Sequence, residues 1–144
     1  MKKLIGLSMV VALFASCSDD DSSSSVSASK LEGKWYYVET KAQGLSIDYE
    51  HMPCAKDYLE FADGGVYREY EVWDCDGNTV SDADTSTGTY TLSGKKVTVT
   101  VDGYTETVTV KKLTGSRLEL SRAMDMDEDG ETDLTVTEVL SSNP

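Results

Sequence analysis

From residue 34 onward the chain alternates between apolar and polar side chains with a period of two, and this pattern constrains its fold more than any other feature. Tyr, Val, Thr and Leu dominate the alternating segments, which polar turns such as Ser93-Gly94 and Asp102-Gly103 separate. Side chains of a β-strand point alternately to opposite faces, so the pattern predicts strands with one buried face. We predict eight strands, at residues 34–40, 58–62, 66–73, 87–92, 95–101, 104–111, 117–123 and 133–140.

The short turns between these segments predict that consecutive strands are antiparallel neighbours. Eight such strands can close into an up-and-down barrel, which leaves no exposed sheet edge. Two stretches break the rhythm, residues 41–57 and 74–86, and we expect both to be loops. The first contains His51, Met52 and Pro53, and it is either a pinned loop or a lid over one end of the barrel. The expected fold is therefore an all-β, eight-stranded antiparallel up-and-down barrel over residues 31–140, with a short tail at 141–144.

The N-terminal segment predicts export. Two lysines precede a largely apolar run at residues 4–14, and the small residues Ala15 and Ser16 then lead into Cys17. This run is too short to cross a bilayer as a helix and has the layout of a secretory signal. It resembles the lipobox of bacterial lipoproteins, which implies removal of residues 1–16 and acylation of Cys17. A covalent lipid on Cys17 would anchor the protein in a membrane.

Residues 17–30 are acidic and rich in serine, a composition typical of a flexible tether. The acidic run after Cys17 also resembles the signal that sends some bacterial lipoproteins to the outer face of the outer membrane. A solvated spacer is the alternative. We expect a lipid-anchored protein of the outer membrane, exposed at the cell surface.

The net charge of the chain is −13, from 13 basic and 26 acidic side chains. Removing residues 1–16 takes away Lys2 and Lys3 and no acid, which leaves 11 basic side chains against 26 acidic ones, a net charge of −15. Such a charge repels phosphate backbones, which excludes nucleic acid as a partner, and it also repels anionic lipid surfaces. We therefore expect membrane attachment to come from the lipid alone.

Three cysteines are present, and assigning Cys17 to the lipid leaves Cys54 and Cys75. In an exported protein this pair predicts a disulfide, with free or metal-bound thiols as the alternative.

Gly33-Lys34-Trp35 at the start of the first predicted strand matches the Gly-x-Trp signature of lipocalins. Together with residues 54–64, 88–92 and 113–118, it resembles the bacterial lipocalin-like lipoprotein domain. The resemblance implies an internal cavity for a small, often apolar molecule. It also implies that Trp35 closes the barrel floor beneath a cation, for which Arg117 and Arg122 are the candidates.

In such a barrel the face of each strand that carries the apolar side chains points inward. We expect an inward set of Leu59, Phe61, Val66, Tyr70, Val72, Tyr90, Leu92, Val97, Val99, Val101, Tyr104, Val108, Val110, Leu118, Leu120, Leu134 and Val136. Arg68, Glu106 and Glu138 share this parity, and buried charges are costly unless paired. Arg68, Tyr70, Tyr90, Tyr104 and Glu106 are therefore candidate ligand-binding residues. An internal ion pair, or strand ends that reach solvent, would explain the charges equally well.

A second candidate site is an acidic cluster between the last two strands. Asp125, Asp127, Asp129, Glu131 and Asp133 follow the spacing D-x-D-x-D-G-x-x-D of a calcium loop. Its flanks are strands rather than helices, and Val136 stands where an EF-hand supplies its bidentate glutamate. We expect weak calcium binding, at about 0.1 to 1 mM. An acidic, solvated hairpin tip is the alternative.

Catalysis has little support in the sequence. His51 is the one histidine, and no serine or cysteine has a visible partner base, so we expect no enzyme activity. The favoured function is binding of a small apolar or amphipathic molecule at the cell envelope. The alternative is a cavity-less barrel that serves as an adhesion or accessory module of an envelope complex.

Overall fold

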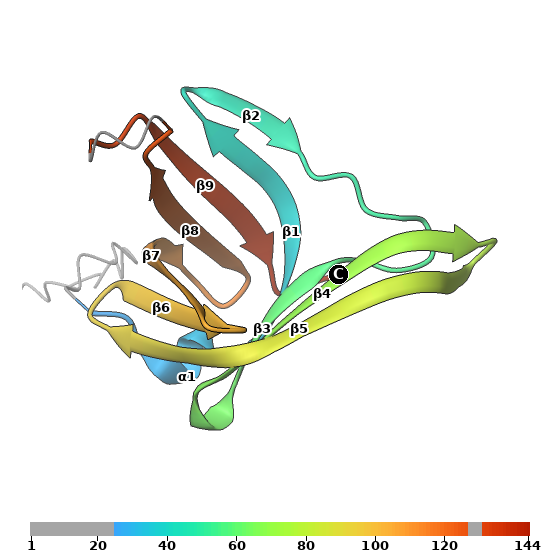
Figure 1. Ribbon diagram of the computed structural model, residues 1–144, viewed down its shortest axis with the longest axis horizontal. Coiled ribbons are helices and arrows are strands. Elements are labelled where there is room, and N and C mark those ends of the chain that lie inside the picture. Colours follow the sequence, from blue (N-terminus) through green and yellow to red (C-terminus); the bar gives the residue numbers. More distant parts are fainter. Residues whose placement is uncertain (1–24, 127–130) are drawn as a thin grey trace, which may run out of the picture.

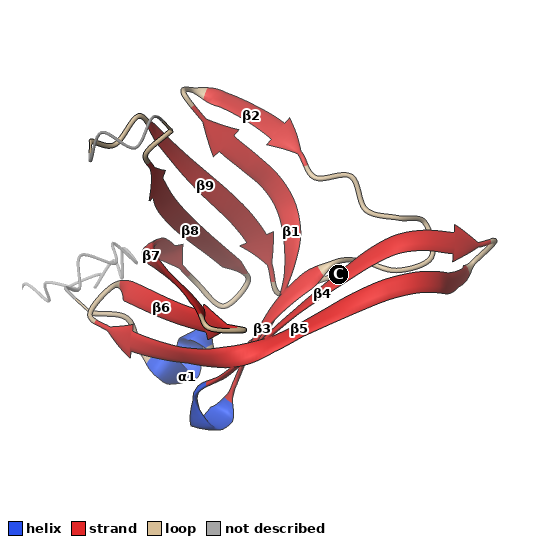
Figure 2. Cartoon of the chain, viewed as in Figure 1, coloured by secondary structure: helices blue, strands red, loops and turns tan. Residues whose placement is uncertain are grey.

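The computed structural model describes residues 25–126 and 131–144 and consists mainly of β-strands. Nine strands form one antiparallel sheet, with a short helix before β1 and a 3-10 turn, η1, between β3 and β4 (Figures 1 and 2). The elements are α1 Ala28–Leu31, β1 Gly33–Ala42, β2 Leu45–Asp48, β3 Tyr58–Ala62, η1 Asp63–Gly65, β4 Val66–Asp76, β5 Thr79–Ser93, β6 Lys96–Val101, β7 Tyr104–Leu113, β8 Arg117–Met124 and β9 Leu134–Ser141.

The sheet closes on itself because β1 pairs with β9, from Tyr36 opposite Ser141 to Ala42 opposite Val136. Along its other edge β1 has two partners: its first residues pair with β3 and its last residues with β2. All eight predicted strands are present and run as antiparallel neighbours. β2 is an additional short strand within the stretch 41–57, which we expected to be a loop.

The expectation of a loop at residues 74–86 is wrong. β4 continues to Asp76, β5 begins at Thr79, and the two remain paired through a tight turn at Gly77. This long hairpin extends beyond the ring of strands in Figure 1. Outside the core the hydrogen-bond ladder alone maintains a strand, so residues 79–86 need no apolar alternation and the sequence signal is absent.

The core fills the end of the barrel that α1 covers. Leu31 from α1 is fully buried, and the indole Nε1 of Trp35 donates a hydrogen bond of 2.8 Å to the carbonyl oxygen of Leu31. Trp35 is 3% exposed and belongs to one cluster with Leu118 and Leu140. Burying each of these side chains contributes about 1.5 to 3 kcal/mol, so this end is closed by tight packing. None of the helices in residues 25–126 and 131–144 is long and apolar enough to cross a bilayer.

Candidate ligand-binding site

A cavity of about 140 Å³ lies inside the ring of strands, above the packed end. The part of the cavity nearest to α1 is apolar, because the strands place Leu59, Phe61, Val99, Val108 and Leu120 toward the interior. Further from α1 the inward side chains become polar. The next inward residue after Trp35 on β1 is Tyr37, two positions later, and the next after Leu120 on β8 is Arg122. The complete lining is Tyr37, Leu59, Phe61, Tyr67, Glu69, Val99, Glu106, Val108, Leu120, Arg122 and Glu138.

Glu69 is held by two tyrosines inside the cavity. The hydroxyl of Tyr37 donates to Glu69 Oε1 at 2.7 Å, and the hydroxyl of Tyr67 donates to Glu69 Oε2 at 3.3 Å. Burial raises the pKa of both tyrosines well above the ordinary value, and the negative charge of Glu69 adds to the rise. Both hydroxyls therefore stay protonated and fix the Glu69 carboxylate in place as hydrogen-bond donors.

Arg122 lies between two further carboxylates. Its guanidinium nitrogens are 3.7 Å from Glu106 Oε1 and 3.8 Å from Glu138 Oε1. Thr40 donates a hydrogen bond of 2.7 Å to the other carboxylate oxygen of Glu138. The Nε of Arg122 is buried and has no hydrogen-bond partner in the described part of the chain. Three carboxylates and one guanidinium give the cavity a formal charge of −2.

A second recess adjoins the cavity on the side away from α1. It has a volume of about 220 Å³ and shares Tyr67, Glu69, Val99 and Glu106 with the cavity. Tyr104 lines its rim and is 84% exposed. The recess therefore connects the charged residues of the cavity to solvent.

The predicted inward orientation of Arg68 and Tyr70 is wrong. Leu59 and Phe61 face inward on β3 and pair with Glu69 and Tyr67 of β4, so Tyr67 and Glu69 line the cavity. Arg68 lies on the opposite face and forms an ion pair of 3.1 Å with Glu60, and Tyr70 stacks on Tyr58 with ring centroids 5.2 Å apart. Tyr58 also carries Lys34 over its ring, at 4.2 Å from the centroid. Aromatic and charged contacts on the outer face thus explain both residues.

The other three candidates have the predicted parity, at different depths. Tyr90 is buried in the core, where its ring meets Phe61 edge to face at 5.1 Å. Glu106 lines both the cavity and the recess. Tyr104 reaches only the outer recess.

The two arginines proposed for the barrel floor have other partners. Arg117 points outward, where its guanidinium contacts Glu119 at 2.8 Å and Glu39 at 3.2 Å, so its predicted place over Trp35 is wrong. Arg122 points inward but lies in the cavity with Glu106 and Glu138. Trp35 occupies the floor with α1, and the carbonyl of Leu31, not a guanidinium, is its polar partner.

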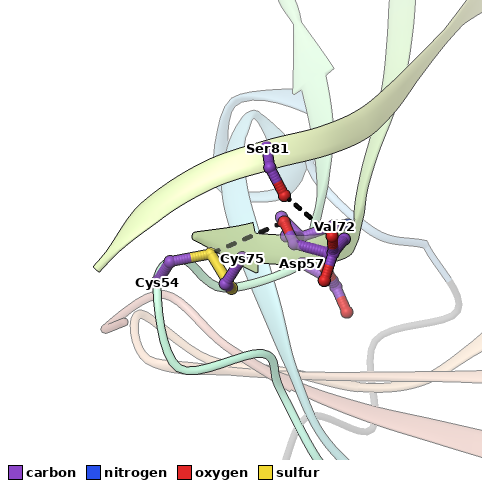
Figure 3. Close-up of a disulfide and its surroundings, with 6 residues drawn as sticks. Cys54, Asp57, Val72, Cys75 and Ser81 are labelled. Carbon is purple, nitrogen blue, oxygen red and sulfur yellow. Dashed lines mark hydrogen bonds between the residues drawn. A yellow bond between two sulfur atoms is a disulfide. The ribbon is translucent and has the colours of Figure 1, made fainter. Parts of the chain in front are cut away.

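The loop between β2 and β3 packs against Tyr37, one of the residues that line the cavity. Tyr49 in this loop stacks on Tyr37 with centroids 4.8 Å apart. Asp57 is 5% exposed; its Oδ1 accepts from the backbone N–H of Val72 at 2.8 Å and its Oδ2 from the hydroxyl of Tyr49 at 2.7 Å. The predicted disulfide between Cys54 and Cys75 is confirmed and ties the same loop to β4 (Figure 3). The loop is therefore fixed to the hairpin at two points.

His51 belongs to this structural network. The backbone N–H of Asp57 donates to His51 Nδ1 at 3.1 Å, which places the ring proton on Nε2, and Nε2 lies 2.8 Å from the carbonyl oxygen of Tyr37. Both ring nitrogens are engaged by the backbone, so the geometry gives His51 a role in positioning the loop.

Two residues of the candidate calcium loop, Asp127 and Asp129, lie outside the described residues. Asp133 accepts a hydrogen bond of 2.7 Å from the backbone N–H of Met126. No group of three or more metal-ligating side chains occurs within residues 25–126 and 131–144. Calcium binding by Asp125, Asp127, Asp129, Glu131 and Asp133 stays a prediction.

Comparison with known families matches residues 31–120 to the model of the lipocalin-like domain. The chain belongs to the lipocalin-like domain family. The fold of this lipocalin-like domain is also similar to that of a lipocalin-like protein from Bacteroides uniformis, with a TM-score of 0.54 and 17% identity over 78% of this chain and 97% of the other. An uncharacterized protein from Bacteroides eggerthii is similar with a TM-score of 0.52 and 14% identity, over 77% of this chain and 98% of that one. Comparison with curated proteins gives no match.

Sequence reasoning missed Tyr37, Tyr67 and Glu69 as cavity residues of this lipocalin-like domain. Tyr37 is two positions after Trp35, and strand alternation from the Gly-x-Trp signature would have placed it inward. Tyr67 and Glu69 were missed because the parity of β4 was assigned from Val66, Tyr70 and Val72. The pairing of β4 with β3, where Leu59 and Phe61 define the inward face, was the signal that identifies them.

Proposed function

We propose that this lipocalin-like protein binds a small amphipathic molecule in the cavity between Phe61 and Arg122. The observation that carries the proposal is the arrangement of the cavity: its closed end is apolar, and its open end holds Glu69, Glu106, Arg122 and Glu138. Ligand sites combine an apolar enclosure with a few placed polar groups in this way.

The size of the cavity favours a ligand with one ring-sized apolar group. About 140 Å³ is close to the size of a dry protein cavity that accepts benzene, and it is several times the volume of one water molecule. The cavity-less alternative fits this volume poorly. A larger polar portion of the ligand would extend into the recess lined by Tyr104 and Glu106.

The charge of the cavity favours a cationic or hydrogen-bond-donating head group. Both carboxylate oxygens of Glu69 already accept from tyrosines, whereas Glu106 meets only Arg122, at 3.7 Å, among the described residues. The Glu106 side chain is 56% exposed, so it is open to an entering ligand. With a formal charge of −2 around it, an ammonium group is stabilised there and a carboxylate is repelled.

We further propose that the protein works as a lipid-anchored protein of the outer membrane, at the cell surface. The support is the lipobox-like segment that ends at Cys17. A disulfide between Cys54 and Cys75 agrees with an oxidising, exported location. Millimolar calcium outside the cell would be available to the acidic loop at residues 125–133.

The ligand proposal is tested with three small probes that share one ring. Benzylamine, benzyl alcohol and benzoate are titrated into the purified protein, and binding is followed through the methyl resonances of Leu120 and Val108. We expect benzylamine to bind most tightly and benzoate least. Glu106→Gln should lower the affinity for benzylamine several-fold and leave that for benzyl alcohol unchanged, while Glu60→Gln on the outer face is the matched control.

Two results would contradict the proposal. If none of the three probes shifts the Leu120 and Val108 resonances, the cavity does not take a ring-sized group. If benzoate binds as tightly as benzylamine, the carboxylates do not select the head group.

A further inference from the structure

Positive charge gathers at the end of the barrel that α1 covers. Six lysines lie there, because the antiparallel ring brings the start of β1, the β5–β6 turn and the end of β7 to the same end. We call this set the basic face; it consists of Lys30, Lys34, Lys95, Lys96, Lys111 and Lys112. Lys41 and Lys56, the two other lysines in the described part of the chain, lie outside this face, on β1 and on the loop before β3.

Five of the six lysines of the basic face are exposed, and Lys95 is half-buried. Lys30, Lys95, Lys111 and Lys112 line one shallow depression together with Ser25 and Val26. None of the six lysines forms an ion pair with a carboxylate in residues 25–126 and 131–144, although the chain carries a net charge of −13.

Acidic residues are more numerous toward the opposite end of the barrel. At the α1 end, Glu32 and Asp63 lie on or beside α1 and η1, and two further carboxylates lie opposite lysines of the basic face in the sheet register, Glu60 opposite Lys34 and Glu119 opposite Lys112. The opposite turns and the projecting hairpin carry Asp48, Glu50, Asp74, Asp76, Asp82, Asp84, Asp102, Asp125, Glu131 and Asp133. The molecule is therefore electrically polar along the barrel axis, with the cavity opening toward the acidic end.

The first described residues emerge from the basic face. Ser25 and Val26 line its depression, and the backbone N–H of Val26 donates to the carbonyl oxygen of Gly94 at 2.8 Å. Cys17 precedes Ser25 by eight residues, and eight residues span at most about 28 Å when fully extended. An acyl group on Cys17 thus keeps the basic face, rather than the acidic end, next to the lipid surface.

We propose that the basic face docks on anionic lipid headgroups of the membrane that holds Cys17, so that the cavity opens away from that membrane. This inference rests on the proposed lipid anchor. Lysines near an anionic surface each strengthen binding roughly fivefold, an effect that decays over about 8 Å at physiological ionic strength. Net charge alone led us to expect attachment from the lipid only; the overall charge does not show that six lysines, none of them in an ion pair among the described residues, lie at one end of the barrel.

The test is lysine acetylation of the full-length protein, purified from the membranes of its host and placed in vesicles. One set of vesicles contains phosphatidylcholine alone, and the other contains phosphatidylcholine with phosphatidylglycerol. Mass spectrometry then reports the acetylation rate of each lysine. We expect Lys95, Lys111 and Lys112 to react at least roughly fivefold more slowly on the anionic vesicles, and half-molar salt to remove this protection. Lys41 and Lys56 serve as internal controls with unchanged rates.

Variants and a competitor complete the test. Replacing Lys95, Lys111 and Lys112 together by glutamine should remove the protection of Lys30, whereas Lys41→Gln with Lys56→Gln should leave it intact. Equal reaction rates of the basic face on both kinds of vesicle would overturn the proposal. Equal protection by short duplex DNA would overturn it as well, by showing a general polyanion site.

The same spectra separate this proposal from that of the anchor. A Cys17 without acyl groups, together with protected lysines on anionic vesicles, would refute the anchor and support the docking. An acylated Cys17 with unprotected lysines would support the anchor and refute the docking.

Discussion

Replacing Asp57 by alanine should destabilise the protein more than replacing any exposed acidic residue. The buried carboxylate accepts two hydrogen bonds, from the Val72 amide at 2.8 Å and the Tyr49 hydroxyl at 2.7 Å. Hydrogen bonds to a charged group contribute about 1.5 to 3 kcal/mol each, so Asp57→Ala should lower the free energy of unfolding by about 3 to 6 kcal/mol. A typical domain has only about 5 to 15 kcal/mol in total.

The assay is urea denaturation, followed through the fluorescence of the protein's two tryptophans. Asp57→Asn keeps one carbonyl oxygen for the Val72 amide, so its loss should be about half that of the alanine variant. Asp48→Ala, at an exposed position on β2, is the control and should change stability by less than about 0.5 kcal/mol. If alanine and asparagine at position 57 cost the same small amount, Asp57 does not fix the loop to β4 and the reasoning is refuted.

Three further predictions concern the barrel wall, the acidic strand β4 and the disulfide. Gly88→Ala should cost about 1 to 3 kcal/mol in urea denaturation, because a Cβ atom there would lie 2.1 Å from the Thr100 carbonyl oxygen; an unchanged midpoint would contradict this contact. Burial and neighbouring carboxylates raise the pKa of Glu71 in the folded protein. The free energy of unfolding should therefore fall as the pH rises from the pKa of Glu71 in the unfolded chain to its higher pKa in the folded protein. Glu71→Gln should therefore raise the thermal midpoint at pH 7 but not below pH 4, and an equal gain at both pH values would speak against a charge effect. Replacing Cys54 and Cys75 by serine should lower stability by about 3 kcal/mol for a sequence separation of 21, measured against wild-type protein with and without a reductant; identical stabilities would exclude a stabilising role.

The barrel was predictable from the sequence wherever one strand face was uniformly apolar. On β6, Val97, Val99 and Val101 share one parity, and the first of these is fully buried as expected. β4 lacks such a signal: Tyr67 faces the cavity and Tyr70 the outside, so aromatic residues occur on both faces. The inward face of β4 also carries Glu69, which only its tyrosine partners explain. Hydrophobicity cannot assign the parity of a strand that lines a polar cavity.

The projecting hairpin shows a different limit of the sequence. Trp73 is 54% exposed, and its indole Nε1 donates to Asp84 Oδ2 at 3.2 Å across the hairpin. Apolar and acidic side chains of the hairpin both face solvent. The sequence there therefore lacks the alternation of apolar and polar residues that predicts a strand. What maintains them is pairing between β4 and β5, a contact that the local sequence does not encode.

The closure of the ring between Tyr36 and Ser141 also sets an order in time. A chain that leaves a ribosome or a translocation channel presents β1 first and β9 last, so β1 waits with one open edge for almost the whole length of the domain. Contacts of such long sequence separation form slowly. Any chain cut before Leu134 would keep two open edges, on β1 and β8, and such edges pair readily with those of other chains. Proteolytic loss of the last strand would therefore favour aggregation of this lipocalin-like domain.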